Sequence, residues 1–292
     1  MHPQGPRTKP ASIGMEKAGL FSIGSLEENI PFVLYPLLLS SDLVLCRCKN
    51  YEYPKNLSVE LINEIKSSLQ KRKIKSVVFD LRIHDWTNTP CLRRSRILAQ
   101  FLQDICSDLQ ISNSIILSNG GQLIGNAVGV FSEKMEAREV LRGEGPLDLT
   151  KFALEIGADF LLMTKKAHQR IEAKKWLRDQ IINGEFSSFH LDFTEKRKLL
   201  SQKKGYVHHL AMDKLHALRS YLTSAHPGIG LSLKKKPGDW IAKGDAIVDV
   251  YLSRGQKNPL KQETCQRIFV ISNDPPNHQP LILERLGLNI HS

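Results

Sequence analysis

A glycine-rich segment at residues 114–149 constrains the fold of this chain more than any other feature. The apolar, β-branched run at 114–117 predicts a buried strand, and the residues beyond carry apolar side chains at helical spacing. Between the two lie Gly120, Gly121, Gly125 and Gly129. A residue without a Cβ atom allows a sharp turn or the close approach of another group. The pattern predicts a strand, a glycine turn and a helix, and spacing by itself favours a tight turn with helix packing over a ligand-binding loop.

The segments around this turn alternate between strand and helix patterns. Strands are expected at 41–48 and 75–83, and helices at 57–69, 91–109, 149–164 and 168–183. Such alternation is typical of a sheet built by right-handed crossovers, so we predict an α/β domain with a mixed sheet flanked by helices. Asp80 falls near the carboxyl end of its strand, where open α/β sheets place ligand contacts.

The pattern of the sequence changes near residue 205, from alternating strands and helices to short strands and turns. Short strand-like pieces surround two strong turn signals, Pro237–Asp239 and Lys243–Asp245. We therefore predict a smaller β-rich α+β domain after the α/β domain, with a boundary between about 190 and 204, where residues 195–204 are largely charged. The Pro- and Gly-rich start is expected to be poorly ordered. The predicted divisions are 1–34 (poorly ordered), 35–195 (α/β) and 205–286 (β-rich).

Charge and cysteine content narrow the class of protein. The chain carries 41 basic and 30 acidic side chains, a formal net charge of +11, and such a surface attracts anions. Its lysine and arginine clusters contain no interleaved aromatic residues, which argues against a groove for single-stranded nucleic acid and favours solvated faces. Five cysteines without a CxxC spacing favour neither a disulfide framework nor a zinc site.

Hydropathy and histidine spacing narrow the class of protein further. No apolar stretch reaches the length of a membrane span, and the first residues lack the apolar core of a secretory signal, so we expect a cytoplasmic protein with no membrane partner. His208 and His209 are adjacent in an expected strand and should face opposite sides of it, which disfavours shared metal ligation. We expect no metal and no cofactor.

The run GGQLIGNAVGVFSEKMEAREVLRGEGPLDL at 120–149 resembles a segment of the thymidine phosphorylase and AMP phosphorylase family, including its Leu-x-Gly-x-Gly-Pro pattern at Leu141 to Pro146. Further matches near 40–45, 76–81 and 237–246 extend the resemblance over roughly residues 35 to 286. Members of this family transfer a pentose from a base to inorganic phosphate. The resemblance therefore implies a pentosyltransferase with a nucleoside or nucleotide ligand and phosphate as co-substrate.

The resemblance also implies a set of substrate contacts, while several family positions differ in this chain. The implied contacts are Arg47, Lys49, Asp80, Arg82, Gly120, Gly121 and Gln122. Glu64 and Ser68 stand where the family has a serine and a lysine, and Arg82 replaces a lysine. The bulky 84–86 segment replaces a small, glycine-rich one. These changes weaken binding of an anion or an electron-rich base. No nucleophile, base and orienting residue can be assembled from spacing, so the catalytic residues are unassigned.

Three functional hypotheses follow. The family's phosphate-binding loop lies upstream of the matched region, so we expect a truncated, diverged homologue that is impaired by itself. A separate chain would supply the phosphate-binding lobe, and a homodimer is a further expectation. The alternative is a catalytically inactive nucleotide-binding or regulatory protein on the same scaffold. A carrier hairpin at 236–250 is the third, but Ser253, Arg254 and Gly255 stand where a lipoyl or biotinyl carrier needs a lysine.

Overall fold

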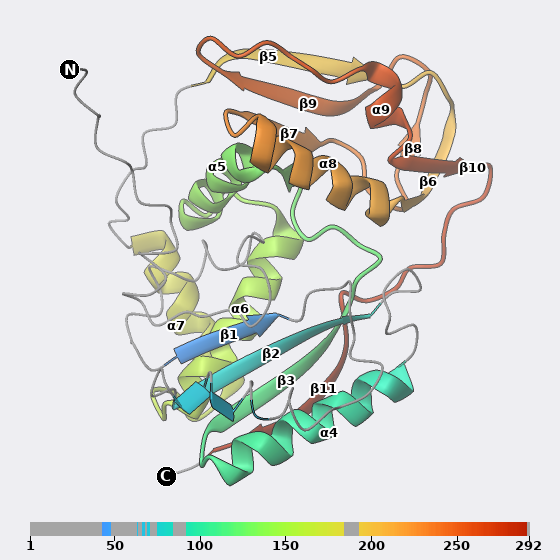
Figure 1. Ribbon diagram of the computed structural model, residues 1–292. Coiled ribbons are helices and arrows are strands. Elements are labelled where there is room, and N and C mark those ends of the chain that lie inside the picture. The colour runs from blue at the N-terminus through green and yellow to red at the C-terminus, as the bar shows by residue number, and fades with distance from the viewer. Residues whose placement is uncertain are drawn as a thin grey trace.

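The computed structural model describes residues 43–47, 75–83, 92–183 and 193–290, together with a few positions between 63 and 70. Figure 1 shows two stacked parts, which we call the α/β half and the β-rich half. The α/β half contains a sheet with helices on both faces, and the β-rich half contains the remaining strands. This confirms the predicted fold class. None of the described helices is long and apolar enough to cross a bilayer.

The α/β half is built on a four-stranded sheet with the order β1-β2-β3-β11. The strands are β1 (Leu43–Arg47), β2 (Ser76–Ile83), β3 (Ser112–Asn119) and β11 (Ile282–Asn289). The first three run parallel, and β11 pairs antiparallel with β3. Helix α4 (Leu92–Asp108) covers one face, while α6 (Leu147–Met163) and α7 (Arg170–Asn183) lie on the other (Figure 1).

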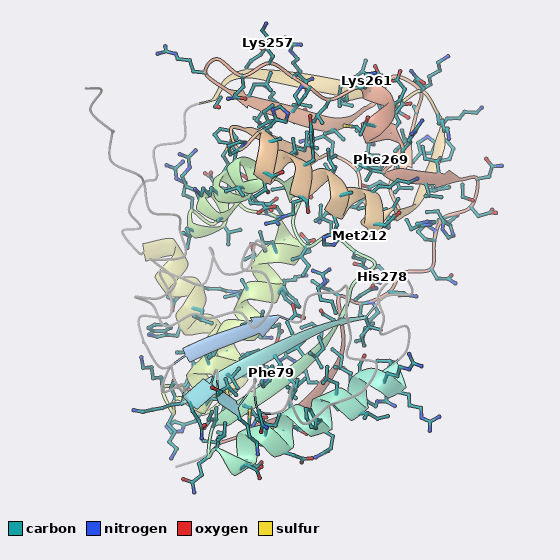
Figure 2. The ribbon with its side chains drawn as sticks, in the orientation of Figure 1. Phe79, Met212, Lys257, Lys261, Phe269 and His278 are labelled. Carbon is teal, nitrogen blue, oxygen red and sulfur yellow. The ribbon has the colours of Figure 1, made fainter. Side chains whose placement is uncertain are left out.

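Both faces of the two central strands are covered, which explains their nearly continuous apolar sequence. Every residue of β2 and β3 is buried. Val78 and Ile116 belong to the apolar cluster formed with α6 and α7, whereas Ile115 and Phe79, which Figure 2 labels, belong to the cluster formed with α4. Because successive side chains of a strand point to opposite faces, a strand that is buried on both faces needs apolar residues at consecutive positions.

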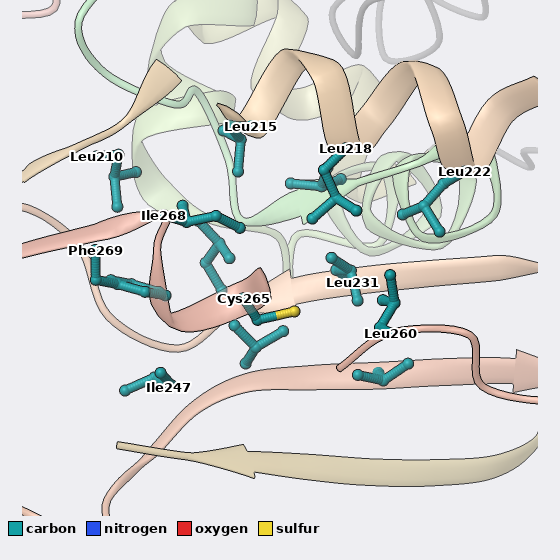
Figure 3. Close-up of a cluster of buried hydrophobic side chains, with 14 of the residues drawn as sticks. Leu210, Leu215, Leu218, Leu222, Leu231, Ile247, Leu260, Cys265, Ile268 and Phe269 are labelled. Atoms are coloured by element: carbon teal, nitrogen blue, oxygen red, sulfur yellow. The ribbon is translucent and has the colours of Figure 1, made fainter. Parts of the chain in front are cut away.

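Two antiparallel sheets form the β-rich half, with the orders β4-β7-β9-β5 and β10-β6-β8. The first consists of β4 (Ala127–Val128), β5 (Phe193–Leu200), β7 (Ile229–Leu233) and β9 (Ala246–Ser253). The second consists of β6 (Gly205–Leu210), β8 (Trp240–Ile241) and β10 (Phe269–Ser272). The helices of this half are α5 (Val130–Leu141), α8 (Met212–Ala225) and α9 (Gln262–Gln266). Leu215, Leu218 and Leu222 of α8 join Leu231 and Cys265 in one buried cluster (Figure 3).

Three elements lie outside the expected pattern. Helix α8 was not predicted, although Met212, Leu215, Leu218 and Leu222 have helical spacing and are all buried. The charged stretch at 195–200 is not a simple connection, because it forms edge strand β5, paired with β9. Charged side chains on an edge strand discourage pairing with other chains. The chain then returns to the α/β half, where β11 pairs with β3. The predicted limits of the β-rich domain, 205–286, stay a prediction.

Candidate functional site

The carboxyl ends of the parallel strands bring several of the predicted site residues to one edge. Arg47 of β1 lies opposite Asp80 of β2, and Arg82 lies opposite Ser118 of β3. Strand β3 then runs into the edge loop, which we define as Asn119–Gln122. Ligands of open α/β sheets bind outside the carboxyl ends of the strands, so this edge is the candidate site.

Arg82 fixes the conformation of the edge loop. Its Nη2 atom donates hydrogen bonds to the carbonyl oxygens of Asn119 (3.1 Å) and Gln122 (2.5 Å), and the side chain is buried. The N–H of Gly120 donates to the carbonyl of Ile83 at 2.8 Å. A guanidinium can hold two carbonyls in a fixed geometry because its donors form a rigid fork. Arg82 therefore positions the loop.

Asp80 lies on β2, two residues before Arg82. Its carboxylate is fully buried and accepts a 2.5 Å hydrogen bond from the Oγ of Ser118. It is not among the residues that line the cleft described next. The geometry gives Asp80 a place in the interior support of the strand end.

A cleft of about 300 Å³ opens beside the edge loop. Its walls come from the edge loop, from β6 and from the connection that leads into β11. The lining residues are Asn119, Gly121, Gln122, His208, His209, Pro237, Pro276, Asn277 and Gln279. Asn119 Nδ2 donates to Gln279 Oε1 at 3.1 Å, and Gln122 Nε2 donates to the Gln279 carbonyl at 2.8 Å. Figure 2 labels His278, from this connection, between the two halves.

The chemistry of this edge cleft is polar and uncharged. Asparagine and glutamine amides both donate and accept hydrogen bonds, and the two histidines add ring nitrogens. No lysine or arginine is among the described residues that line it. Such a lining suits a small neutral molecule with several donors and acceptors better than it suits an anion.

His208 and His209 lie on the same face of their strand, contrary to the sequence prediction. Val270 pairs with His209 and Ile271 pairs with Val207, so His208 is the extra residue of a β-bulge. A bulge reverses the alternation of side chains locally. The two Nδ1 atoms are 3.2 Å apart, and both rings reach the edge cleft. Partial burial and the neighbouring His208 lower the pKa of His209. Within the described residues, no group of three or more potential ligands could hold a metal ion.

The structure brings five of the seven predicted contacts together: Asp80, Arg82, Gly120, Gly121 and Gln122. Gly121 and Gln122 line the edge cleft. Arg47 is placed by its backbone opposite Asp80, and Lys49 lies outside the described residues, as do Glu64, Ser68 and 84–86.

Sequence reasoning missed several residues that line the same cleft. Asn119, Gln279 and the histidine pair are the clearest cases. Asn119 directly precedes the predicted glycine turn, so its position offered a signal. Gln279 is 160 residues away from Asn119, and no local pattern links the two.

The second part of the glycine segment connects the two halves. The N–H of Gly125 donates to Asp148 Oδ2 at 3.1 Å, and the same carboxylate forms an ion pair with Lys236. Gly125 has a φ of +73°, and a Cβ atom there would overlap the carboxylate of Glu136. Gly125 therefore serves a turn that requires a left-handed backbone and the close approach of Glu136.

Glu136 accepts hydrogen bonds on one oxygen only. Oε1 accepts from the N–H groups of Asn126 (2.6 Å) and Ala127 (3.1 Å). Oε2 is buried and has no hydrogen-bond partner among the described residues. Burial is the main cause that raises the pKa of Glu136 from 4.5 to about 7, although the two N–H donors and Lys236 oppose the shift.

Replacing Glu136 with glutamine should remove a pH-dependent loss of stability. Because the folded chain raises this pKa, the native state favours the protonated carboxyl and loses stability as the pH rises from 4.5 through about 7. Glutamine keeps an oxygen for the two N–H donors without the charge. We expect E136Q to exceed the wild type by on the order of 2 kcal/mol at pH 8 and by much less at pH 5. Urea unfolding at both pH values measures the difference.

The exposed Glu144, in the next turn, supplies the control. E144Q should change stability little, because this side chain is exposed. A pH-independent effect of E136Q would contradict the raised pKa.

Sequence comparisons are consistent with the resemblance seen in the motifs. No protein-family model matches the chain. It is 26% identical to a pyrimidine-nucleoside phosphorylase of Geobacillus stearothermophilus, over 79% of this chain and 60% of the relative. A pyrimidine-nucleoside phosphorylase of Staphylococcus epidermidis is 25% identical, over 66% of this chain and 52% of the relative. A pyrimidine-nucleoside phosphorylase of Staphylococcus aureus is 24% identical, over 68% of this chain and 53% of the relative.

These similarities confirm the resemblance to the thymidine phosphorylase family, at the level of the pyrimidine-nucleoside phosphorylases. The chain spans between about half and three fifths of the length of these relatives.

Proposed function

We propose that this chain binds a pyrimidine nucleoside in the edge cleft and, by itself, is impaired in phosphorolysis of that nucleoside to base and pentose phosphate. Similarity to pyrimidine-nucleoside phosphorylases supports the ligand and the reaction class. The observation that carries the proposal is the edge loop, which Arg82 fixes at the carboxyl edge of the sheet and which opens onto an amide-lined cleft. Inorganic phosphate is the proposed co-substrate, and no cofactor is invoked.

The cleft supports a nucleoside over a nucleotide. A pyrimidine presents carbonyl acceptors and an N–H or amino donor, which side-chain amides can pair with on both sides. Its lining, within the described residues, includes no lysine or arginine that could neutralise a 5′-phosphate. A binding site that leaves a phosphate unpaired would lose affinity for a nucleoside monophosphate.

The proposed impairment of phosphorolysis rests on two residues that the resemblance aligns with the base-binding helix of the family. Transfer of a pentose passes through a cation-like sugar, so the protein must hold phosphate and steady the departing base. The resemblance aligns Glu64 with a serine of the family and Ser68 with a lysine. Both changes make that position less positive. Lysine restored at Ser68 should therefore strengthen phosphate or base binding.

A second candidate is a nucleoside-binding regulator without turnover. The observation that favours it is the engagement of the edge residues in structural contacts. Arg82 holds two loop carbonyls, and Asp80 is fully buried against Ser118. Residues occupied in this way support a fixed binding surface rather than groups that move protons.

Thermal unfolding with and without ligand tests the proposal. A nucleoside at ten times its Kd should stabilise the native state by about 1.4 kcal/mol. We expect uridine or thymidine to raise the Tm more than the corresponding monophosphate does. Q122A and Q279A should abolish the rise. Q100A, which removes an exposed amide of α4, should leave it unchanged.

Release of free base in the presence of phosphate then separates the two candidates. Slow release supports the impaired enzyme, and stabilisation without release supports the regulator. Rapid turnover by the purified chain would contradict impairment, and no stabilisation by any pyrimidine nucleoside would contradict the binding proposal itself.

A further inference from the structure

The outer face of the sheet β10-β6-β8 carries an uncovered group of aromatic rings. Val207, Ile241 and Phe269 point inward and belong to the buried cluster of the β-rich half. The opposite side carries Tyr206, His208, His209 and Trp240, which we call the aromatic face. Trp240 is 49% exposed, and an exposed ring that adjoins other rings offers a surface on which a planar group can stack.

Strand pairing brings these rings together. Tyr206 lies directly opposite Trp240, and their ring centroids are 4.9 Å apart at an angle of 75°. On the same strand, the bulge turns His208 and His209 outward, with ring centroids 5.5 Å apart. The histidines also line the edge cleft, so the aromatic face continues into it.

Lysines flank the two strands that carry Tyr206 and Trp240. Lys203 and Lys204 precede β6, and Lys243 follows β8. Two backbone hydrogen bonds of 2.8 Å between Ser201 and the 244–245 turn hold these segments side by side. The Nζ atom of Lys235 donates to the backbone carbonyl of Trp240 at 2.8 Å and lies 3.5 Å from Asp245 Oδ2, so a fourth lysine lies beside the start of β8.

The β-rich half holds most of the excess positive charge. Residues 193–279 contain 15 lysines and arginines and seven aspartates and glutamates, a balance of +8 out of +11 for the whole chain. The lysine and arginine clusters of the sequence contain no interleaved aromatic residues, and this spacing predicted no groove for single-stranded nucleic acid. Pairing of β6 with β8 changes that expectation, because it brings the Tyr206 and Trp240 rings together on two strands that lysines precede or follow in the sequence.

We propose that the aromatic face binds single-stranded nucleic acid. Exposed rings offer stacking surfaces to successive bases, and the lysines meet the phosphates. An acidic peptide would use the lysines but gain little from the rings. A second copy of the chain would have to place its own positive surface against this one. Charge and stacking together therefore favour the nucleic acid, and this inference does not depend on the proposed nucleoside site.

Fluorescence anisotropy of a labelled twelve-residue oligothymidylate tests the proposal on the full chain. We expect binding that weakens with salt, with a slope of log K against log salt of about −2 for three neutralised phosphates. Replacing Trp240 or Tyr206 with alanine should weaken binding about tenfold, because the variant loses the stacking of one base on the ring. K203Q/K204Q should reduce the salt slope by about 1.4, if each lysine neutralises one phosphate. These variants should leave stabilisation by nucleoside unchanged.

A matched control removes the same charge elsewhere. Lys165 and Lys166 are an exposed adjacent pair in the turn after α6, in the α/β half. K165Q/K166Q should bind the oligonucleotide as the wild type does. Equal loss in both double variants would show nonspecific attraction and overturn the proposal. So would wild-type affinity in W240A, equal competition by polyglutamate of the same charge, or a stable dimer that W240A converts to monomer. Near-ultraviolet circular dichroism checks that each variant is folded.

Discussion

The Asp159→Ala variant is expected to lose about 3 to 5 kcal/mol of stability, because it breaks a buried ionic network. Asp159 lies on α6 and is fully buried. Its Oδ2 accepts hydrogen bonds from Arg285 Nη1 at 2.7 Å and from Ser114 Oγ at 3.0 Å, and Arg170 Nη2 lies 2.5 Å from Oδ1. One carboxylate therefore joins α6, α7, β3 and β11. Equilibrium urea unfolding measures the loss.

Glu155, one turn earlier on α6, explains why the loss is not larger. It accepts a 2.5 Å hydrogen bond from Arg285 Nη2 and pairs with Lys174. After removal of Asp159, this carboxylate still partly neutralises Arg285. D159N keeps the shape and an acceptor for Ser114, so it should lose less than D159A.

An exposed ion pair supplies the control for the network. Asp108 pairs with Lys66 at 2.7 Å, but its side chain is 62% exposed. D108A should cost less than about 1 kcal/mol, as exposed pairs usually do. Equal urea midpoints for D159A and D108A would contradict a stabilising role for the buried network.

The central sheet could be predicted from the sequence because its signal is local. Strands β2 and β3 are covered on both faces, and each therefore shows a short apolar run without alternation. The glycine turn and the helices after it followed from residue type and spacing. Helix α8 offered the same kind of signal at Met212, Leu215, Leu218 and Leu222, and it could have been found.

The site was less predictable, because its walls come from distant segments. The hydrogen bond between Asn119 and Gln279 joins residues that are 160 positions apart. The histidine pair depends on a bulge that only the pairing of β6 with β10 creates. Likewise, β5 is rich in charged residues because it is an edge strand, and its position beside β9 cannot be read from its own residues.

Resemblance to a family named a set of substrate contacts, and their role in binding stays a prediction. The structure shows that Asp80, Arg82 and the edge loop lie together at the carboxyl ends of β2 and β3. The structure adds that Arg82 Nη2 donates hydrogen bonds to two carbonyl oxygens of the loop, and that Asp80 is fully buried. Sequence motifs mark where a backbone is constrained, whereas the partner of each side chain depends on tertiary packing.

The connection between α5 and α6 shows such a constraint and carries the second large prediction. Helix α5 ends in a Schellman motif, in which Gly143 N–H donates to the Val140 carbonyl and Glu144 N–H to the Glu139 carbonyl, both at 2.9 Å. Gly145 then folds back against the last turn of the helix. A Cβ atom on Gly145 would lie 2.6 Å from Val140 Cα and 2.7 Å from Val140 N.

Gly145→Ala is therefore expected to destabilise the chain by about 3 kcal/mol or more, since backbone atoms cannot move aside as a flexible side chain can. Gly143 lies two residues away and supplies the matched control. It has a φ of +78° and open space around its Cβ position, so G143A should cost only about 1 to 2 kcal/mol of backbone strain. The ratio of the two losses, measured by urea unfolding, separates steric contact from backbone conformation. A G143A loss equal to or greater than that of G145A would mean that the turn is limited by its left-handed backbone and not by contact with Val140.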